Sequence, residues 1–293
     1  MNETLLPFEY LDGQTYADKG SHTVQVKATT SGWDKRQATL VLGIFGSGKN
    51  QLRPLIIFKG KSSYTGARSA YYQNKRDEEM SHYNSRVIVR WNETAYANAT
   101  LLIEWITSFL VPVMPSGQKL LALDIAKFHC TEPVLQTLRD NDIIPSIIPA
   151  GCTGLVQPLD VSVNKPFKDL LRDLIDEALD RHENTHATDL RELRKSDHNA
   201  IAQRRILITK CVSEAWELFC IKHQELIVTT FRKLGLTLPI DGSCDTELAI
   251  KGISKELLEI GDWQRLENSI GLPIPSSDTN HEIDNSDIEF VDS

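Results

Sequence analysis

The order of strand-like and helical segments is the feature that most constrains the fold of this chain. Apolar and β-branched residues favour strands over four early stretches, residues 23–29, 37–43, 52–59 and 86–91. A segment with the length and apolar face of a helix follows at 99–111, and two short apolar runs, 119–123 and 143–149, then flank a helical segment at 132–141. Strands followed by alternating strands and helices predict a mixed sheet with helices packed against it.

The remaining segments set the expected domain organisation. Apolar residues recur at helical spacing from Phe167 to Leu179, and a second long helix is expected over roughly 200–233. Residues 60–84 are polar and are interpreted as an exposed loop, whereas 119–123 suits a strand buried on both faces. We therefore expect an α/β core over 1–182, a helical C-terminal part of the same domain over 183–240, and a partly helical to disordered acidic tail over 241–293.

Charge and cysteine content exclude some classes of protein. The chain has 40 acidic and 32 basic residues, a formal net charge of −8, but six of the acids lie in 278–293, where Lys and Arg do not occur. The other 34 acids nearly balance the bases, so charge alone does not predict nucleic-acid binding. The five cysteines form no CxxC pair, which argues against a disulfide framework or a zinc ribbon. No run of about eighteen apolar residues suggests a membrane span.

Two short motifs suggest functions of other classes. Residues 43–50, GIFGSGKN, approach a phosphate-binding loop, but Asn50 stands where a hydroxyl would hold Mg²⁺ and a strand-like run follows, so a Gly-rich turn is preferred. His182, Glu183 and His186 match the HExxH signature of zinc metallopeptidases. Their flanks are polar all around, whereas a catalytic zinc ion lies in a dry, shaped cavity. A zinc metallopeptidase remains an alternative.

Two aspartates and a histidine occupy positions that suit metal-dependent chemistry. Asp124 ends the apolar run KLLALD, and in open α/β sheets the carboxyl ends of strands face the ligand crevice. His129 follows five residues later. Asp160 lies in LVQPLD, at the start of a long helix, where helix capping is the simpler explanation. If the two carboxylates converge, they would bind a hard divalent cation such as Mg²⁺ or Mn²⁺.

These segments resemble the DDE superfamily endonuclease domain of pogo-type transposases, a group with Tigger, jerky and centromere protein B relatives. QPLDVSVNKPFKDLLR (157–172) resembles the third-acid block, LLALDIAKFH (120–129) the second, and MNETLLPF (1–8) the strand with the first acid. The resemblance covers roughly residues 1–240. It implies an RNase H-like mixed sheet flanked by helices and DNA strand cleavage by two metal ions, which clamp the attacking and leaving oxygens.

The resemblance also implies ligands, partners and location. Its metal positions correspond to residue 2, Asp124 and Asp160, with Mg²⁺ or Mn²⁺ as cofactor, DNA as substrate and the nucleus as location. This chain departs from the pattern because Asn2 replaces the first acid. A neutral amide is a poor bridge between two dications, so we expect weakened metal binding and an impaired enzyme. Glu3 is not expected to compensate, since adjacent strand residues point to opposite faces.

Two further expectations follow from the resemblance. Family members carry helix-turn-helix modules before this domain, and no residue precedes Met1, so the part that recognises a DNA end is expected to be missing. The remaining function would be weak DNA binding, or association with a second copy of the chain or with a nuclear protein. A still-active Mg²⁺- or Mn²⁺-dependent DNA endonuclease, with Asn2 as a tolerated ligand, is the nearest alternative.

Overall fold

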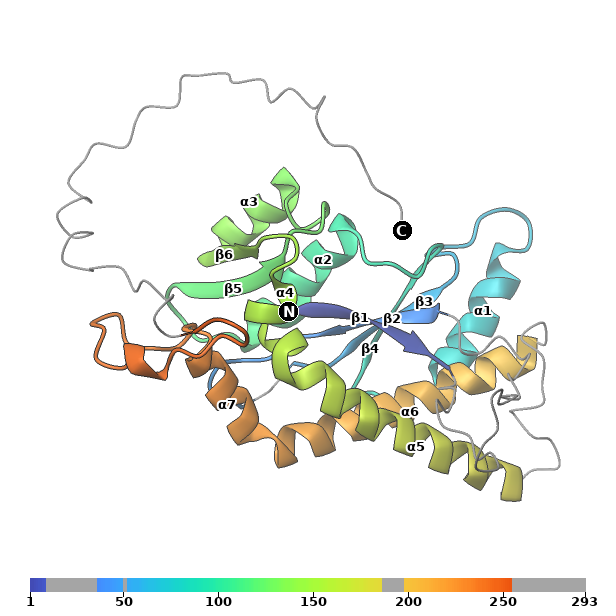
Figure 1. Cartoon of the computed structure of the whole chain (residues 1–293). Coiled ribbons are helices and arrows are strands. Elements are labelled where there is room, and N and C mark those ends of the chain that lie inside the picture. The colour runs from blue at the N-terminus through green and yellow to red at the C-terminus, as the bar shows by residue number, and fades with distance from the viewer. Residues whose placement is uncertain (9–35, 50–51, 186–197, 255–293) are drawn as a thin grey trace, which may run out of the picture.

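The described part of the chain forms six strands and seven α-helices, most of them at the places expected from the sequence (Figure 1). The computed structural model describes residues 1–8, 36–49, 52–185 and 198–254. The strands are β1 (Asn2–Pro7), β2 (Arg36–Leu42), β3 (Leu55–Lys59), β4 (Ile88–Asn92), β5 (Lys119–Asp124) and β6 (Ile143–Ile148). The helices are α1 (Ser69–Met80), α2 (Ala99–Trp105), α3 (Glu132–Asp140), α4 (Thr153–Val156), α5 (Asn164–Thr185), α6 (His198–Lys222) and α7 (Gln224–Lys233).

The predicted mixed sheet is confirmed, and its hydrogen bonds form two ladders. Strands β1, β2 and β3 are antiparallel neighbours, and β4 lies parallel to β3 at the edge. Strands β5 and β6 form a separate parallel pair. The two ladders meet at the start of β1, where the Met1 amino group donates a hydrogen bond to the carbonyl oxygen of Ala122 in β5 at 3.1 Å.

Alternation of side chains along the strands divides the core into two layers. Leu40 and its neighbours on one face of the four-stranded sheet pack against Phe167 of α5 and Phe219 of α6. Val41 and the opposite face pack against Trp105 of α2, together with α3, β5 and β6. Figure 1 shows α5 and α6 below this sheet and α2 and α3 above it. Because successive strand residues point to opposite faces, the central strands are apolar on both sides.

The exposed loop predicted over residues 60–84 is wrong, because Ser69–Met80 form helix α1. This helix has no apolar stripe, so periodicity did not reveal it. A tertiary contact holds it instead: Arg76 is only 7% exposed, and its guanidinium lies 4.3 Å from the ring of Tyr64 and 4.6 Å from that of Trp91. Helices without an apolar face need such contacts to persist.

Two further predictions need correction. The strand at 119–123 is not buried on both faces, because Leu120 is 51% exposed beside its equally open partner Ile144. The single helix predicted over 200–233 is interrupted at His223, between α6 and α7. The Gly-rich turn is confirmed, since Gly43 and the residues after it join the antiparallel strands β2 and β3.

Some predictions fall outside the described residues. These include the strand at 23–29 and the acidic segment at 278–293. The domain boundaries at 182 and 240 stay predictions. In the described part of the chain, no helix combines the length and apolar character needed to cross a membrane.

Strand β1 offers a matched test of this packing. Leu6 is fully buried in the layer between the sheet and helices α5 and α6, whereas the adjacent Leu5 is 37% exposed. Leu6→Ala is expected to lower the free energy of unfolding by about 2–5 kcal/mol through cavity formation, and Leu5→Ala by less than about 1 kcal/mol. Chemical denaturation of both variants measures the difference, and equal losses would contradict the strand orientation.

Candidate active site

Strand β1 places Asn2 against Asp160, although 158 residues separate them in sequence. The Asn2 Nδ2 donates to the Asp160 Oδ1 at 2.6 Å, and the backbone N–H of Glu3 donates to the Asn2 Oδ1 at 2.6 Å. A backbone N–H can only donate and a carboxylate oxygen can only accept, so these partners determine which way the amide is turned. The one atom of the Asn2 side chain that could ligate a cation therefore faces its own strand.

The QPLD turn holds Asp160 in this position. Gln157, which is 1% exposed, donates from Nε2 to the carbonyl oxygen of Met1 at 2.8 Å and so ties the turn to the start of β1. Leu159 is buried and anchors the same turn in the core. Pro158 occupies the N-cap of the helical segment, and Asp160 lies in its first turn. Asp160 is therefore not the capping residue that its sequence context allowed.

A second amide, from Asn164, also binds Asp160. Its Nδ2 donates to the same Oδ1 atom at 2.8 Å. Asn164 lies four residues after Asp160, a spacing at which side chains on a helix are neighbours, so sequence reasoning could have found this residue. Sequence reasoning did not assign a role to Gln157, whose partner is 156 residues away.

Asp124, at the end of β5, is bound to His129. The His129 Nδ1 lies 2.6 Å from the Asp124 Oδ1, and the N–H of Ala126 donates to the same oxygen at 3.1 Å. Burial by itself would lower the pKa of His129, but its interactions with Asp124 and Glu3 together outweigh burial and raise that pKa to about 9. The hydrogen bond from His129 lowers the pKa of Asp124 below its usual value. His129 is therefore a cation and Asp124 an anion at neutral pH.

Glu3 lies on the opposite side of β1 from Asn2. Its Oε1 is 3.8 Å from the Nε2 of His129, an ion-pair distance that is too long for a hydrogen bond. Asn2 contacts Asp160 while Glu3 approaches His129, and that Glu3 does not replace Asn2 as a metal ligand stays a prediction.

Both aspartates lie near the amino group of Met1, the residue that precedes β1. Burial lowers the pKa of the Met1 amino group to about 5, while the charges of Asp124 and Asp160 act in the opposite direction. The same nitrogen is thus within electrostatic reach of both carboxylates. Among the described residues, no group of three or more His, Cys, Asp or Glu side chains is arranged to hold a metal ion. The two carboxylates have the chemistry that suits a hard cation, whereas the oxygen of the Asn2 amide accepts from the Glu3 N–H.

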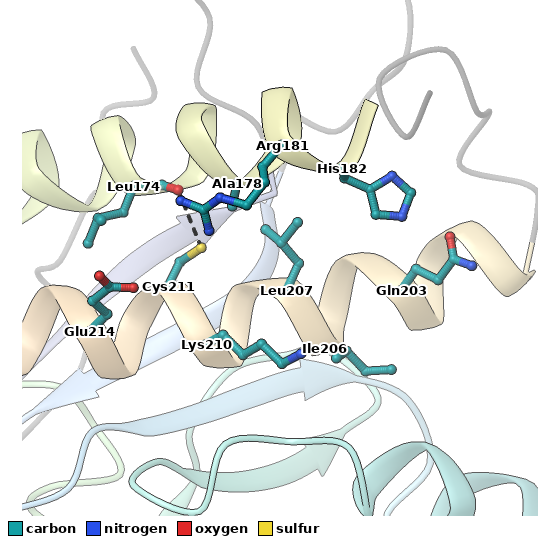
Figure 2. Close-up of a pocket in the computed structure, with 10 residues that line it drawn as sticks. All are labelled: Leu174, Ala178, Arg181, His182, Gln203, Ile206, Leu207, Lys210, Cys211 and Glu214. Carbon is teal, nitrogen blue, oxygen red and sulfur yellow. Dashed lines mark hydrogen bonds between the residues drawn. The ribbon is translucent and has the colours of Figure 1, made fainter. Parts of the chain in front are cut away.

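A separate pocket of about 440 Å³ lies between α5 and α6 (Figure 2). His182 lines it together with the cationic side chains of Arg181 and Lys210, an environment that disfavours a zinc ion. Burial raises the pKa of the Cys211 thiol in this pocket to about 12, which makes it a poor nucleophile at neutral pH. The Glu183 side chain and His186 lie outside the described residues, so the structure does not assemble the HExxH motif.

Comparison with known protein families supports the resemblance that was based on the second- and third-acid blocks. The family model described as DDE superfamily endonuclease matches residues 35–226, a range that contains Asp124 and Asp160 and begins after Asn2. No solved structure shows a significant match to this chain.

Curated proteins named for the pogo transposable element are similar to this chain at low sequence identity. The human protein named Pogo transposable element with ZNF domain is 25% identical over 103 residues, which cover 34% of this chain and 7% of that protein. Pogo transposable element with KRAB domain is 25% identical in mouse and 26% in human over 174 residues, 58% of this chain and 26% of each relative. The chain thus spans about a quarter or less of these relatives. Because the family match covers more than half of this chain, and both candidate aspartates with it, the chain belongs to the DDE superfamily of endonucleases.

Proposed function

We propose that this chain is a transposase-derived, DNA-binding DDE domain whose metal-dependent cleavage is impaired at Asn2. The observation that carries the proposal is the hydrogen bond from the Asn2 amide to Asp160, together with the bond from the Glu3 N–H that turns the amide oxygen away. The position that corresponds to the first acid is thereby occupied by a hydrogen-bond donor. A donor cannot ligate a cation.

The missing negative charge at residue 2 weakens metal binding more than the loss of one ligand atom would. Asp124 and Asp160 bring two negative charges, against the four positive charges of two dications, and Asn2 adds none. Two adjacent dications repel each other strongly unless several anionic oxygens lie between them. The amides of Asn2 and Asn164 satisfy Asp160 without a cation, which stabilises the metal-free arrangement.

The remaining ligand atoms define what the site could still hold. Within the described part of the chain, Asp124 and Asp160 accept hydrogen bonds through Oδ1, which leaves Oδ2 of each for a cation. When bound, Mg²⁺ or Mn²⁺ would act as a Lewis acid on a phosphate oxygen. The chain's own contribution is positional: His129 orients Asp124, and Gln157 and Asn164 orient Asp160.

DNA is the proposed partner, and the nucleus the proposed location. Support comes from the family, whose description is an endonuclease, and from relatives named for a transposable element. A second copy of the chain or a nuclear protein are further proposed partners. A still-active endonuclease is the second candidate, because both aspartates keep an oxygen free for metal.

An acid at residue 2 is expected to make the thermal stability of the protein depend on a bound metal ion. Asn2→Asp removes the hydrogen bond to Asp160 and sets two carboxylates side by side, so the variant should unfold at a lower temperature than the natural protein in EDTA. Mn²⁺ should reverse this loss, with about 3 kcal/mol of stabilisation at a hundredfold excess over Kd. Thermal unfolding with and without Mn²⁺ measures both effects.

Two variants control this experiment. Asn2→Ala removes the same hydrogen bond without adding a charge and should gain no response to Mn²⁺. Asn2→Asp combined with Asp160→Asn should lose the response. An equal Mn²⁺ stabilisation of the natural protein would show that Asn2 does not impair metal binding.

Cleavage can be tested on supercoiled plasmid in Mn²⁺. The natural protein is expected to leave the plasmid intact, whereas Asn2→Asp should nick it, and adding Asp124→Ala should abolish that nicking. Nicking by the natural protein that disappears in Asp124→Ala would instead establish the active endonuclease. If Asn2→Asp gains neither Mn²⁺ stabilisation nor nicking while Asp124 and Asp160 remain, residue 2 is not the first metal position.

A further inference from the structure

The segment between β3 and β4 has a charge opposite to that of the whole chain. Residues 59–76 contain five basic residues and no Asp or Glu, in a protein with a formal net charge of −8; the five are Lys59, Lys61, Arg68, Lys75 and Arg76. Figure 1 shows α1, which this segment enters, at the opposite edge of the four-stranded sheet from Met1 and α4. A local basic surface away from the candidate metal site favours an anionic partner of its own.

Aromatic rings are stacked within the same segment. Tyr64 and Tyr72 lie nearly parallel, with ring centroids 5.5 Å apart, and Tyr71 meets Tyr72 edge-on at 5.4 Å. On the inner side, the Arg76 guanidinium lies between the rings of Tyr64 and Trp91. The stack therefore runs from the sheet edge outward to Tyr71 and Tyr72. We call Tyr64, Tyr71 and Tyr72 the tyrosine platform.

Hydrogen bonds fix the inner end of this stack. The Arg76 Nη2 donates to the Tyr64 hydroxyl at 2.7 Å, and its Nη1 donates to the carbonyl oxygen of Ser62 at 3.2 Å. Arg205 of α6 lies 4.9 Å from the Trp91 ring and binds Glu79 through two hydrogen bonds. The platform is thus held in place before any ligand binds, which lowers the entropy that binding would cost.

The outer end of the stack is open. Tyr71 is 63% exposed and Tyr72 is 44% exposed, although aromatic side chains of this size usually bury most of their surface. Lys59, Lys61, Arg68 and Lys75 are exposed in the same segment, and none forms an ion pair with a carboxylate in the described part of the chain. Arg68 at the N-cap of α1 and Lys75 within it lie one helical turn from Tyr72 and Tyr71. Open aromatic faces in a segment with unpaired cations suit a ligand that has both planar rings and negative charges.

We propose that the tyrosine platform binds single-stranded nucleic acid. A base stacks on Tyr71 or Tyr72, and the flanking phosphates contact the surrounding lysines and Arg68. Duplex nucleic acid fits less well, because its bases are already stacked on each other and present no face to a tyrosine. The site uses none of the residues around Asn2, so it stands whether or not the metal-dependent proposal holds.

Fluorescence anisotropy of labelled strands tests this site in the full chain. The measurement uses EDTA, so that the metal site does not contribute, with oligo-dT, oligo-rU and a DNA duplex of equal length as the three ligands. At least one of the single strands should bind more tightly than the duplex, and comparison of the two distinguishes DNA from RNA. Tyr71→Leu should weaken that binding roughly 5- to 100-fold, while Tyr71→Phe, which keeps the ring, should preserve it.

Charge variants test the phosphate contacts. Lys61→Gln combined with Lys75→Gln should reduce the slope of log affinity against log salt concentration by about 1.4. Lys222→Gln, on the exposed end of α6, is the matched control and should leave the slope unchanged. Unchanged thermal unfolding of Tyr71→Leu would show that α1 remains folded.

Three results would overturn the proposal. They are duplex binding as tight as that of the tighter-binding single strand, single-strand affinity that does not change in Tyr71→Leu, and the absence of single-strand binding at low salt. Repeating the measurement with Asp124→Ala separates the two sites, since loss of the metal ligand should leave anisotropy in EDTA unchanged.

Discussion

The antiparallel register of β1 against β2 is the constraint on which the candidate active site depends. Leu6 pairs with Ala38 and lies fully buried, and the same alternation directs Asn2 toward Asp160 and Glu3 toward His129. A slip of one residue would expose Leu6, at about 1.5–3 kcal/mol, and exchange the positions of the amide and the acid. Core packing and the chemistry of the site are therefore determined by one register.

The contacts of Asp160 explain how its carboxylate is accommodated beside the core. A carboxylate beside a core is costly unless it is hydrogen-bonded, and two amide groups meet that need here. Asn and Asp have nearly the same shape, so exchanging one for the other leaves the packing of β1 intact while changing its charge. The packing of β1 therefore does not require an acid at this position.

Average charge was a poor guide to the surface of this protein. The body of the chain is close to neutral, yet residues 59–76 contain only basic charges and meet an exposed group of tyrosines. Helix α1 escaped sequence reasoning for the same reason that its surface is open: its tyrosines and charges do not form an apolar stripe. Its position depends on Arg76 between Tyr64 and Trp91, a contact between segments that periodicity cannot reveal.

The sequence by itself determined most of the strands, the helices that carry an apolar face, the place of Asp124 at a strand end, and the acid blocks that identify the family. These features have short periods or fixed local spacing, so neighbouring residues are sufficient to specify them. Only the tertiary structure decided that Asn2 donates to Asp160, that β5 has one open face, and that a helix occupies residues 69–80. Each depends on contacts between distant segments, whose geometry follows from packing of the whole core rather than from local pattern.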